Sequence, residues 1–553
     1  MNIYTLIVEQ IQKALKKLGI KTEEVLLEHP NELSNGDFST NIAMMCAKHE
    51  GKNPKELAER IVEILNKKKT DEIEKIEVAG PGFINFHLSR EFFTAQTEMI
   101  INQKEKWGKN ETLKGKKVMV EYTDPNPFKE MHIGHLMANA IGESIARLIE
   151  NSGAETIRAN YQGDVGLHVA KAIYGMTELK EKNVTVKYLG EAYAYGAKAY
   201  ENNVKAKETI DEINKKVYSK GDVVVDELYK RGREVSLEHF EEIYKKLGTK
   251  FDKYYFESEM VGVGKKFVEE NKKVFEESDG AIVYRGEKHG LHTRVFITSE
   301  GLPTYETKDL GLATQKFNDY SLDLSITITA EEQKEYFKVM RAAFGEVHPK
   351  LEKKMLHITH GMMRLPSGKM SSRKGDVISA ESLLAEVEKA VEEKMKDRDI
   401  KDKEAVAESI SVGGLKFSIL KQATGRDIVF DFDKALSFEG DSGPYLQYAH
   451  TRSLALLSKG GEGDVKDAPK VVTELERILY RFPEIAKRAK VEYEPHHVTV
   501  YLTELASAFN SWYANVPVIG GKNEKYGLAL TRAFQITMQN GLWLLGIKTP
   551  EHM

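Results

Sequence analysis

Two histidines, His132 and His135, mark the part of this sequence that is best suited to bind a phosphate group. The apolar run at 118–120 predicts a strand before them, and the apolar spacing at 136–149 predicts a helix after them. Both would then lie on one face of the first helical turn, where free backbone N–H groups and the helix dipole favour an anion. Gly134, between them, leaves room for a base or a ribose. The alternative is that the histidines only cap a helix.

A second stretch, residues 368–375, reads Gly-Lys-Met-Ser-Ser-Arg-Lys-Gly and holds its basic side chains between two glycines. Such a loop is suited to close on a pyrophosphate group, although by itself it also fits a solvated surface turn. Residues 132–135 and 369–373 together resemble the paired signatures of class I aminoacyl-tRNA synthetases. Nearly the whole chain resembles the arginyl-tRNA synthetases, least clearly over residues 176–262.

The resemblance implies a reaction and its partners. L-arginine would be activated with ATP, with Mg²⁺ as counter-ion, to arginyl-adenylate and pyrophosphate, and the arginyl group would pass to the 3′ end of tRNA(Arg). We expect a cytoplasmic monomer with no membrane partner and no protein-bound structural metal. The net charge of −4 does not point to a nucleic-acid binder, but local basic patches are sufficient for such binding.

The composition fits this expectation. A chain of 553 residues is too long for one core, and no apolar run approaches the roughly 20 residues of a membrane span. The first residues have the pattern of an amphipathic helix and not of a signal peptide. A single cysteine, Cys46, rules out an internal disulfide and a multi-cysteine zinc site.

Strands that alternate with helices after residue 108 predict an α/β fold with a Rossmann-like parallel sheet, which binds ligands at the carboxyl ends of its strands. Neither Gly-x-Gly-x-x-Gly nor a Walker lysine motif is present, so the dinucleotide-binding and P-loop interpretations lose their main support. An alternating stretch at 76–88 contains a Gly-Pro-Gly turn. Further strands are expected at 118–122, 156–161, 281–284, 294–298 and 322–329, and helices at 3–19, 54–68, 193–214, 222–247, 331–344 and 381–424.

Four domains are expected from the same resemblance. They are an α+β N-terminal additional domain that binds the D-loop of the tRNA (1–108), the catalytic domain with a helical insertion at about 176–262 (109–380), a helical connector (381–425) and an all-α anticodon-binding domain (426–553). We expect a chain truncated at about residue 425 to keep a folded catalytic unit.

The resemblance assigns roles residue by residue. The catalytic set is His132, His135, Lys369, Lys129 and Arg373. ATP would be bound by Phe128, His132, Gly134, His135, Met363, Lys369, Met370 and Ser371, and arginine by Glu121, Asn126, Tyr305, Asp309 and Gln333. A guanidinium group needs carboxylates and neutral acceptors around it, and the five residues expected to bind arginine have side chains of those types. The tRNA contacts would be Phe83, Asn85, Tyr445, Tyr448, Tyr513 and Met553, although each of the aromatic ones also fits a core position.

One position departs from the usual class I pattern. Ser372 stands where the common loop has a second lysine. In the arginyl family such a change often accompanies a lysine just before the histidine signature, and Lys129 is placed there. We infer that Lys129 supplies the missing charge; the alternative is a solvent-facing turn lysine.

Other functions fit this sequence less well. A cysteinyl enzyme needs cysteine ligands for zinc, which one cysteine cannot supply, and the editing synthetases need a larger insert. Two alternatives of different classes are a small-molecule nucleotidyltransferase, which would not need the helical C-terminal domain, and a non-catalytic tRNA-binding relative, which would have lost the signature residues. ATP–pyrophosphate exchange with each amino acid, with and without tRNA, discriminates among them.

Overall fold

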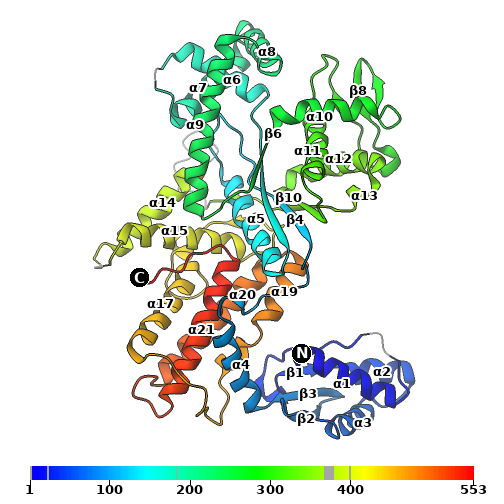
Figure 1. Cartoon of the computed structure of the whole chain (residues 1–553), viewed down its shortest axis with the longest axis vertical. Coiled ribbons are helices and arrows are strands. Elements are labelled where there is room, and N and C mark those ends of the chain that lie inside the picture. The colour runs from blue at the N-terminus through cyan, green and yellow to red at the C-terminus, as the bar shows by residue number, and fades with distance from the viewer. Residues whose placement is uncertain (1–2, 22–23, 182, 366–378, 398–399) are drawn as a thin grey trace. The chain divides into compact units, whose positions relative to one another are not determined.

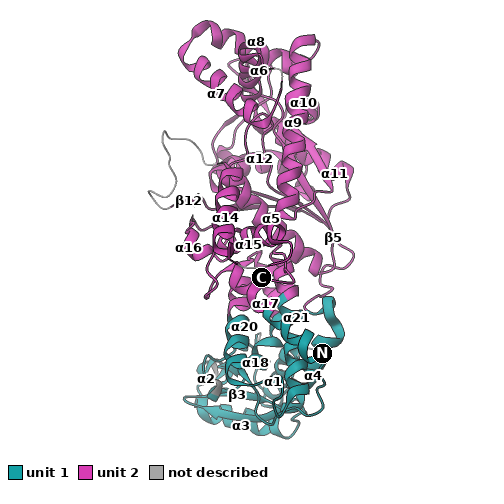
Figure 2. Cartoon of the chain, turned by 90° about the vertical axis from the view of Figure 1, so that its left-hand side faces the viewer, with its two compact units in different colours: residues 1–107, 452–482, 504–538 teal, residues 108–451, 483–503, 539–553 magenta. Residues whose placement is uncertain are grey.

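The computed structural model describes residues 3–21, 24–181, 183–365, 379–397 and 400–553 (Figure 1). It divides into two compact units (Figure 2). The first contains residues 1–107, 452–482 and 504–538, and the second contains residues 108–451, 483–503 and 539–553. Each unit therefore combines early and late parts of the sequence. Within the described ranges, no helix has the length and hydropathy needed to cross a membrane.

The early part of the first unit is an α+β module. Its elements are α1 (Ile3–Lys17), β1 (Phe38–Thr40), α2 (Ile42–Glu50), α3 (Pro54–Asn66), β2 (Ile73–Ala79), β3 (Phe83–Leu88) and α4 (Arg90–Gln103), with an antiparallel sheet in the order β1-β3-β2. The expected helices at 3–19 and 54–68 are confirmed, and Asn53 caps the second by accepting backbone N–H groups of Lys55 and Glu56. The stretch at 76–88 is confirmed as a hairpin. β1 and α2 were not predicted, because β1 has only three residues and no alternation.

Helices from the end of the chain complete the core of this unit. The Tyr480 ring packs against Phe38, Phe92 and Phe93, with ring centroids 6.3, 5.3 and 5.7 Å away. The Arg90 guanidinium pairs with the Glu476 carboxylate. The late elements are residues 452–460 of α17 (Gly443–Gly460), α18 (Glu474–Leu479) and the parts of α20 (His496–Asn515) and α21 (Glu524–Leu544) that fall within 504–538.

A five-stranded parallel sheet forms the centre of the second unit. Its order is β11-β10-β4-β5-β6, with β4 (Lys117–Glu121), β5 (Glu155–Gln162), β6 (Lys253–Phe256), β10 (Leu324–Ala330) and β11 (Met355–His360). After β4 the chain adds β5 and β6 on one side and later returns to add β10 and β11 on the other. The order reverses between β4 and β10, where parallel α/β sheets bind their ligands. The predicted fold class, with strands at 118–122, 156–161 and 322–329, is confirmed.

The two faces of this sheet are covered by different helices. α5 (Ile133–Asn151) contacts β4, β5 and β10, and its Gly142 is required because a Cβ there would lie 2.2 Å from the Tyr122 ring. On the other face Met119, Ile157, Ala159 and Tyr161 pack with residues of α10 (Glu257–Glu270) and α11 (Tyr305–Asp319). Because side chains alternate along a strand, Glu121 faces the same side as Met119. The α11 face therefore carries the polar groups.

The segment between β5 and β6 contains four helices: α6 (Leu167–Leu179), α7 (Val186–Asn202), α8 (Val204–Ser219) and α9 (Val223–Leu247). The single stretch expected at 193–214 is divided, because Asn203 ends α7 and its side chain caps α8 by accepting the Ala206 N–H. The expected helix at 222–247 is confirmed as α9. β6 lies inside the expected insertion at 176–262, yet it belongs to the central sheet.

The remaining elements of the second unit are strands and helices outside the central sheet. The strands are the antiparallel β7 (Glu276–Ser278), β8 (Ala281–Tyr284) and β9 (Arg294–Ile297), and the pair β12 (Met363–Arg364) and β13 (Ile428–Val429). The whole helices are α12 (Lys334–Val347), α13 (Pro349–Glu352), α14 (Ala380–Met395), α15 (Lys403–Leu420) and α16 (Phe432–Ala435). Four further helices belong to this unit in part: α17 (Gly443–Gly460) up to residue 451, α19 (Phe482–Glu492) from residue 483, residues 496–503 of α20 and residues 539–544 of α21.

The carboxyl end of α21 is held by side chains of α5 and α15. The last carbonyl groups of a helix have no partner within the helix. Here Arg147 donates to the Trp543 carbonyl at 3.0 Å, Ser144 to Leu544 at 2.8 Å, and Lys416 to Gly546 at 2.8 Å. Residues 483–503 and 539–553 belong to the second unit, so a chain truncated near residue 425 would lack part of it. That such a chain keeps a folded catalytic unit stays a prediction.

Lys416 provides a test of this junction. Its ammonium group is buried and also donates to the Leu247 carbonyl, at the end of α9, at 2.7 Å. Lys416→Met keeps much of the side-chain volume but removes the donor from two carbonyl groups, at about 1–3 kcal/mol for each. We expect a lower midpoint of thermal unfolding. Lys421→Met, at the residue that follows α15, partly exposed and paired with Asp441, is the matched control and should change the midpoint less.

The same variant should reveal a pH dependence. Burial, followed by the positive charge of Arg147, lowers the pKa of Lys416 to about 7, whereas an unfolded lysine titrates near about 10.4. Between these values the unfolded chain binds a proton that the folded protein lacks, so the stability of the wild type rises with pH. The midpoint difference between wild type and Lys416→Met should widen from about pH 7 to about pH 9. A constant or shrinking difference would contradict the burial of a neutral lysine.

Candidate active site

The turn between β4 and α5 places the two histidines at the start of a helix, as predicted. α5 begins at Ile133 with His132 as its cap: the His132 Nδ1 accepts the Gly134 N–H at 3.1 Å. The His135 Nδ1 accepts the His132 N–H at 3.1 Å, and the two rings stack with centroids 3.7 Å apart. A Cβ at residue 134 would lie 2.9 Å from the His132 ring, so this position requires glycine.

These hydrogen bonds determine which nitrogen of each ring carries the proton. A nitrogen that accepts an N–H cannot itself be protonated, so Nδ1 is bare and Nε2 carries the hydrogen in both rings. Burial and then Lys129 lower the pKa of His132, and burial and then His132 lower the pKa of His135 further. Both rings are therefore neutral donors through Nε2–H near neutral pH. Because Nδ1 makes the capping hydrogen bonds and Nε2–H remains for a ligand, the histidines can cap the helix and also bind a phosphate group.

The backbone that leads to the histidines is strained and held by side chains. Thr123, Asp124 and Phe128 have φ values of 80°, 46° and 68°, which non-glycine residues rarely adopt. Asp124 Oδ1 accepts the Tyr161 N–H at 2.7 Å, and the Phe128 N–H donates to the Ser236 hydroxyl at 2.9 Å. Strain of this kind persists only where surrounding structure imposes it, and it is frequent at functional sites.

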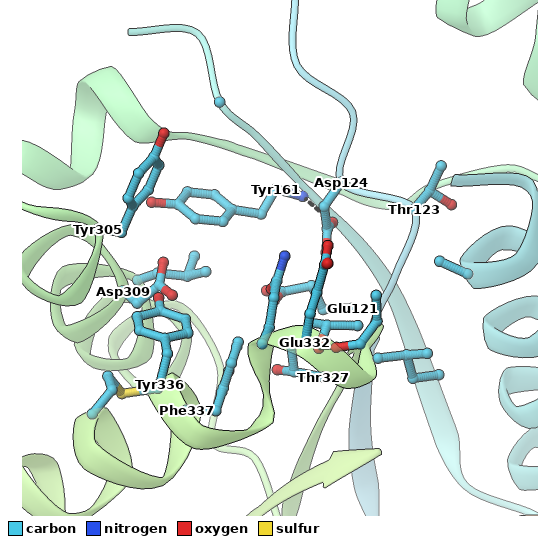
Figure 3. A pocket seen from close by; sticks show the side chains of 18 of the residues that line it. Glu121, Thr123, Asp124, Tyr161, Tyr305, Asp309, Thr327, Glu332, Tyr336 and Phe337 are labelled. Atoms are coloured by element: carbon cyan, nitrogen blue, oxygen red, sulfur yellow. Dashed lines mark hydrogen bonds between the residues drawn. The ribbon is translucent and has the colours of Figure 1, made fainter. Parts of the chain in front are cut away.

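A cavity of about 510 Å³ opens beside this turn, where the order of the sheet reverses. All five expected arginine-binding residues line it, together with His132, Gly134 and His135. Figure 3 shows Glu121, Asp124, Asp309 and Tyr305 around the same space. Tyr305 and Asp309 lie one turn apart on α11, as predicted, and Gln333 precedes α12. The cavity brings together residues that are 212 positions apart in the sequence, from Glu121 to Gln333.

Buried carboxyl groups dominate the electrostatics of this cavity. Glu121 forms an ion pair with Lys316, and Glu257 with Lys308. Asp309 has no ion pair within the described part of the chain, and burial, then Glu257 and Glu121, raise its pKa well above the usual value. Burial and then Glu121 likewise raise the pKa of Asp124. The cavity thus holds more acidic than basic groups and is suited to a cationic ligand.

Other predicted residues lie around this cavity or apart from it. Lys129 is not among the lining residues; its Nζ lies 4.5 Å from the centroid of the Tyr193 ring, on α7, while its charge acts on both histidines. The Phe128 side chain is completely buried in an apolar cluster, so that only its backbone can reach a ligand. Met363 is buried in β12. The predicted loop residues Lys369, Met370, Ser371 and Arg373 lie outside the described residues, as does Ser372.

The expected tRNA contacts have varied surroundings. Phe83 is exposed on β3, whereas Asn85 is buried and its Oδ1 accepts the Ser39 hydroxyl at 2.7 Å. Tyr445 and Tyr448 are half-buried on α17, and Met553 is half-buried at the last position. Tyr513 is 37% exposed on α20, with the Arg452 guanidinium 5.6 Å from its ring centroid.

Several residues that line the cavity were not among the site residues predicted from the sequence. They are Asp124, Tyr161, Glu257, Lys316, Glu332, Tyr336, Phe337 and His360. Asp124 and Tyr161 follow or end predicted strands, and the rule that ligands bind at strand carboxyl ends was sufficient to find them. Glu257 follows β6, whose Tyr254, Tyr255 and Phe256 are of types favoured in strands. The strand has only four residues and lies within the expected helical insertion, so it was not predicted.

Comparison with known proteins places the chain in a family. Residues 96–432 match the model of the class I tRNA synthetase (R) catalytic domain, residues 5–88 that of the arginyl-tRNA synthetase N-terminal domain, and residues 446–553 that of the DALR anticodon-binding domain. The arginine–tRNA ligase of Clostridium perfringens is 31% identical over 100% of both chains, and that of Lactococcus lactis subsp. cremoris SK11 is 32% identical over 97% of both.

Solved structures agree with this placement. The arginyl-tRNA synthetase of Thermus thermophilus has a TM-score of 0.79 at 25% identity and covers 99% of this chain and 100% of its own. The Plasmodium falciparum arginyl-tRNA synthetase shares the fold, with a TM-score of 0.82 at 21% identity over the full length of both chains. The chain belongs to the arginyl-tRNA synthetases, which activate L-arginine with ATP to arginyl-adenylate, release pyrophosphate and transfer the arginyl group to the 3′ end of tRNA(Arg).

Proposed function

We propose that both steps of the reaction take place in the 510 Å³ cavity, with the arginine side chain at Asp309 and the ATP phosphates at His132 and His135. The observation that supports this most strongly is that one continuous cavity is lined both by the five residues expected to bind arginine and by His132, Gly134 and His135. The reacting carboxylate and the α-phosphate would then meet between the two groups, so that the cavity accelerates the reaction chiefly by positioning them.

Arginine recognition depends on charge. Asp309, half-buried and without an ion pair among the described residues, gives the guanidinium group its main carboxylate. Glu121, Asn126, Gln333 and Tyr305 add acceptors around it. A guanidinium group has five N–H donors and no acceptor, so a lining of carboxylate, amide and hydroxyl oxygens matches it.

ATP binding depends on donors. His132 and His135 direct Nε2–H groups at the phosphates, next to the amino end of α5. The backbone at Phe128 and Gly134 and the side chain of Met363 surround the nucleotide. The sequence resemblance assigns Lys369, Met370, Ser371 and Arg373 to ATP binding and catalysis. Mg²⁺ is carried by the phosphate oxygens of the nucleotide, as Mg²⁺ usually is in such sites.

The tRNA is bound by the domains at 1–108 and 426–553, with the catalytic domain at 109–380, its helical insertion and the connector at 381–425 between them in the sequence. Phe83 meets the D-loop, while Asn85 orients its strand. Tyr445, Tyr448, Tyr513 and Met553 contact the RNA from the helical domain, and Tyr513 with its neighbour Arg452 offers a stacking surface. The enzyme works as a cytoplasmic monomer and has no structural metal.

Asp309 provides the first test. Asp309→Ala removes a charged partner of the guanidinium group, which costs about 1.5–3 kcal/mol. The KM for arginine in ATP–pyrophosphate exchange should rise on the order of 10- to 100-fold, and the KM for ATP should change little. Asn318→Ala, at an exposed position on the same helix, is the control. An unchanged arginine KM in Asp309→Ala would remove Asp309 from the pocket.

Lys129 provides the second test. If its charge acts mainly in the transition state, Lys129→Ala lowers kcat about 10²–10³-fold with a smaller effect on arginine binding. Adding Ser372→Lys should restore part of the activity if both positions serve one phosphate group. Lys171→Ala is a matched control, because the Lys171 Nζ also lies 4.5 Å from a tyrosine ring centroid, that of Tyr200. A negligible effect of Lys129→Ala together with no rescue would make Lys129 a surface lysine.

A further inference from the structure

Tyr161 has an unusual position among the cavity residues. It is 9% exposed at the end of β5, and its hydroxyl oxygen is buried without a hydrogen-bond partner in the described part of the structure. Figure 3 shows its ring extending away from Asp124, with the hydroxyl on the side of Tyr305 and Asp309. A buried hydroxyl without a partner destabilises a folded protein and is rare. The missing partner is therefore to be sought in a ligand of the cavity.

The charges around Tyr161 define what its hydroxyl can do. Burial, then the Glu257 and Asp309 carboxylates, raise the pKa of Tyr161 well above its usual value. The phenol therefore stays protonated and neutral at any physiological pH. Its oxygen accepts hydrogen bonds, and its single proton is attracted to the neighbouring carboxylates.

The cavity needs such a neutral acceptor. Glu121 and Glu257 are already engaged with Lys316 and Lys308. A guanidinium group that binds Asp309 through two N–H groups has three further N–H donors. Each donor that stays unpaired in a buried site weakens binding. Another carboxylate would add to an existing excess of negative charge, whereas a phenol oxygen accepts a donor without adding charge.

We propose that Tyr161 is a specificity-determining residue for arginine, whose hydroxyl oxygen accepts a hydrogen bond from the substrate guanidinium group while its proton is directed to a neighbouring carboxylate. This role rests on the proposed function, which places that group at Asp309. A planar guanidinium extends its donors over several acceptors, whereas a lysine ammonium concentrates three donors at one point. Tyr161 therefore contributes to the selection of arginine over other cationic amino acids.

The adjacent strand contains a matched control. Tyr255 pairs in register with Tyr161 on β6 and is also buried, but its hydroxyl donates to Asp319 at 3.1 Å and it does not line the cavity. Tyr161→Phe and Tyr255→Phe thus remove the same atom from neighbouring positions of one sheet. Only the first change removes it from the proposed arginine site.

Three measurements test the role of Tyr161 in the full-length enzyme. Tyr161→Phe should weaken arginine binding by calorimetry and raise its KM on the order of 10- to 100-fold, with kcat and the KM for ATP near those of the wild type. The thermal midpoint of the free enzyme should not fall, because the lost hydroxyl has no partner there. The rise in midpoint that saturating arginine produces should become smaller. Tyr255→Phe should lower the midpoint and leave arginine binding unchanged.

Asp309→Asn, measured in parallel, separates this inference from the proposed function. Unchanged arginine binding in Tyr161→Phe, with weakened binding in Asp309→Asn, would overturn the role of Tyr161 alone. Unchanged binding in both variants would move the guanidinium group away from this cavity. A lowered midpoint of free Tyr161→Phe with normal arginine binding would show that the hydroxyl is structural and would also overturn the inference.

Discussion

The concentration of negative charge beside one strand end is the constraint on which the rest of this enzyme depends. Glu121 and Glu257 are buried and Asp124 and Asp309 are half-buried around one cavity. Burial raises the pKa of Glu257, and burial together with neighbouring carboxylates raises the pKa of Asp124 and Asp309. Among the described residues, Lys308 and Lys316, on the same face of α11, pair with Glu257 and Glu121, and Arg294, which also lines the cavity, pairs with Glu306. The site is therefore an incomplete ionic cluster, and a cationic side chain completes it. This arrangement explains how a cavity with many polar groups can be selective. The carboxylates select a ligand by its positive charge, and the neutral acceptors between them select it by the positions of its hydrogen-bond donors.

The phosphate side of the cavity is governed by backbone conformation. Thr123, Asp124 and Phe128 have positive φ values, and they are held by partners from three different elements: Asn139 on α5, Tyr161 on β5 and Ser236 on α9. In addition, the Phe128 ring packs so closely on α9 that a Cβ at Gly232 would lie 2.1 Å from it. The helical segment between β5 and β6 therefore supports the active site. Its α9 packs against the turn before the histidines, and the Tyr193 ring on α7 contacts the Lys129 ammonium group.

Local features of the site were predictable from the sequence, and features that depend on strand order were not. The histidine turn, the helix-face pair Tyr305 and Asp309, and the fold class follow from periodicity, spacing and resemblance. Glu257 and Lys308 could not be paired from the sequence, because their proximity depends on β6, a strand of only four residues, joining the sheet next to β5. The division of the C-terminal helices between two units could not be predicted from the sequence either. Helical periodicity shows which face of α20 or α21 is buried, but not which partner covers it.

The distribution of the two units along the chain has a consequence for synthesis. Tyr480 completes the aromatic core around Phe38 and Phe92, and the carbonyl groups of residues 543–546 receive the donors of Arg147, Ser144 and Lys416. Domains usually fold in order as the ribosome releases them. Here neither unit can complete its core until the final part of these 553 residues has emerged. The histidine turn is translated before residues 543 and 544, whose carbonyl groups are hydrogen-bond partners of α5. A chain interrupted before them would contain the two signature histidines without the structure that supports them.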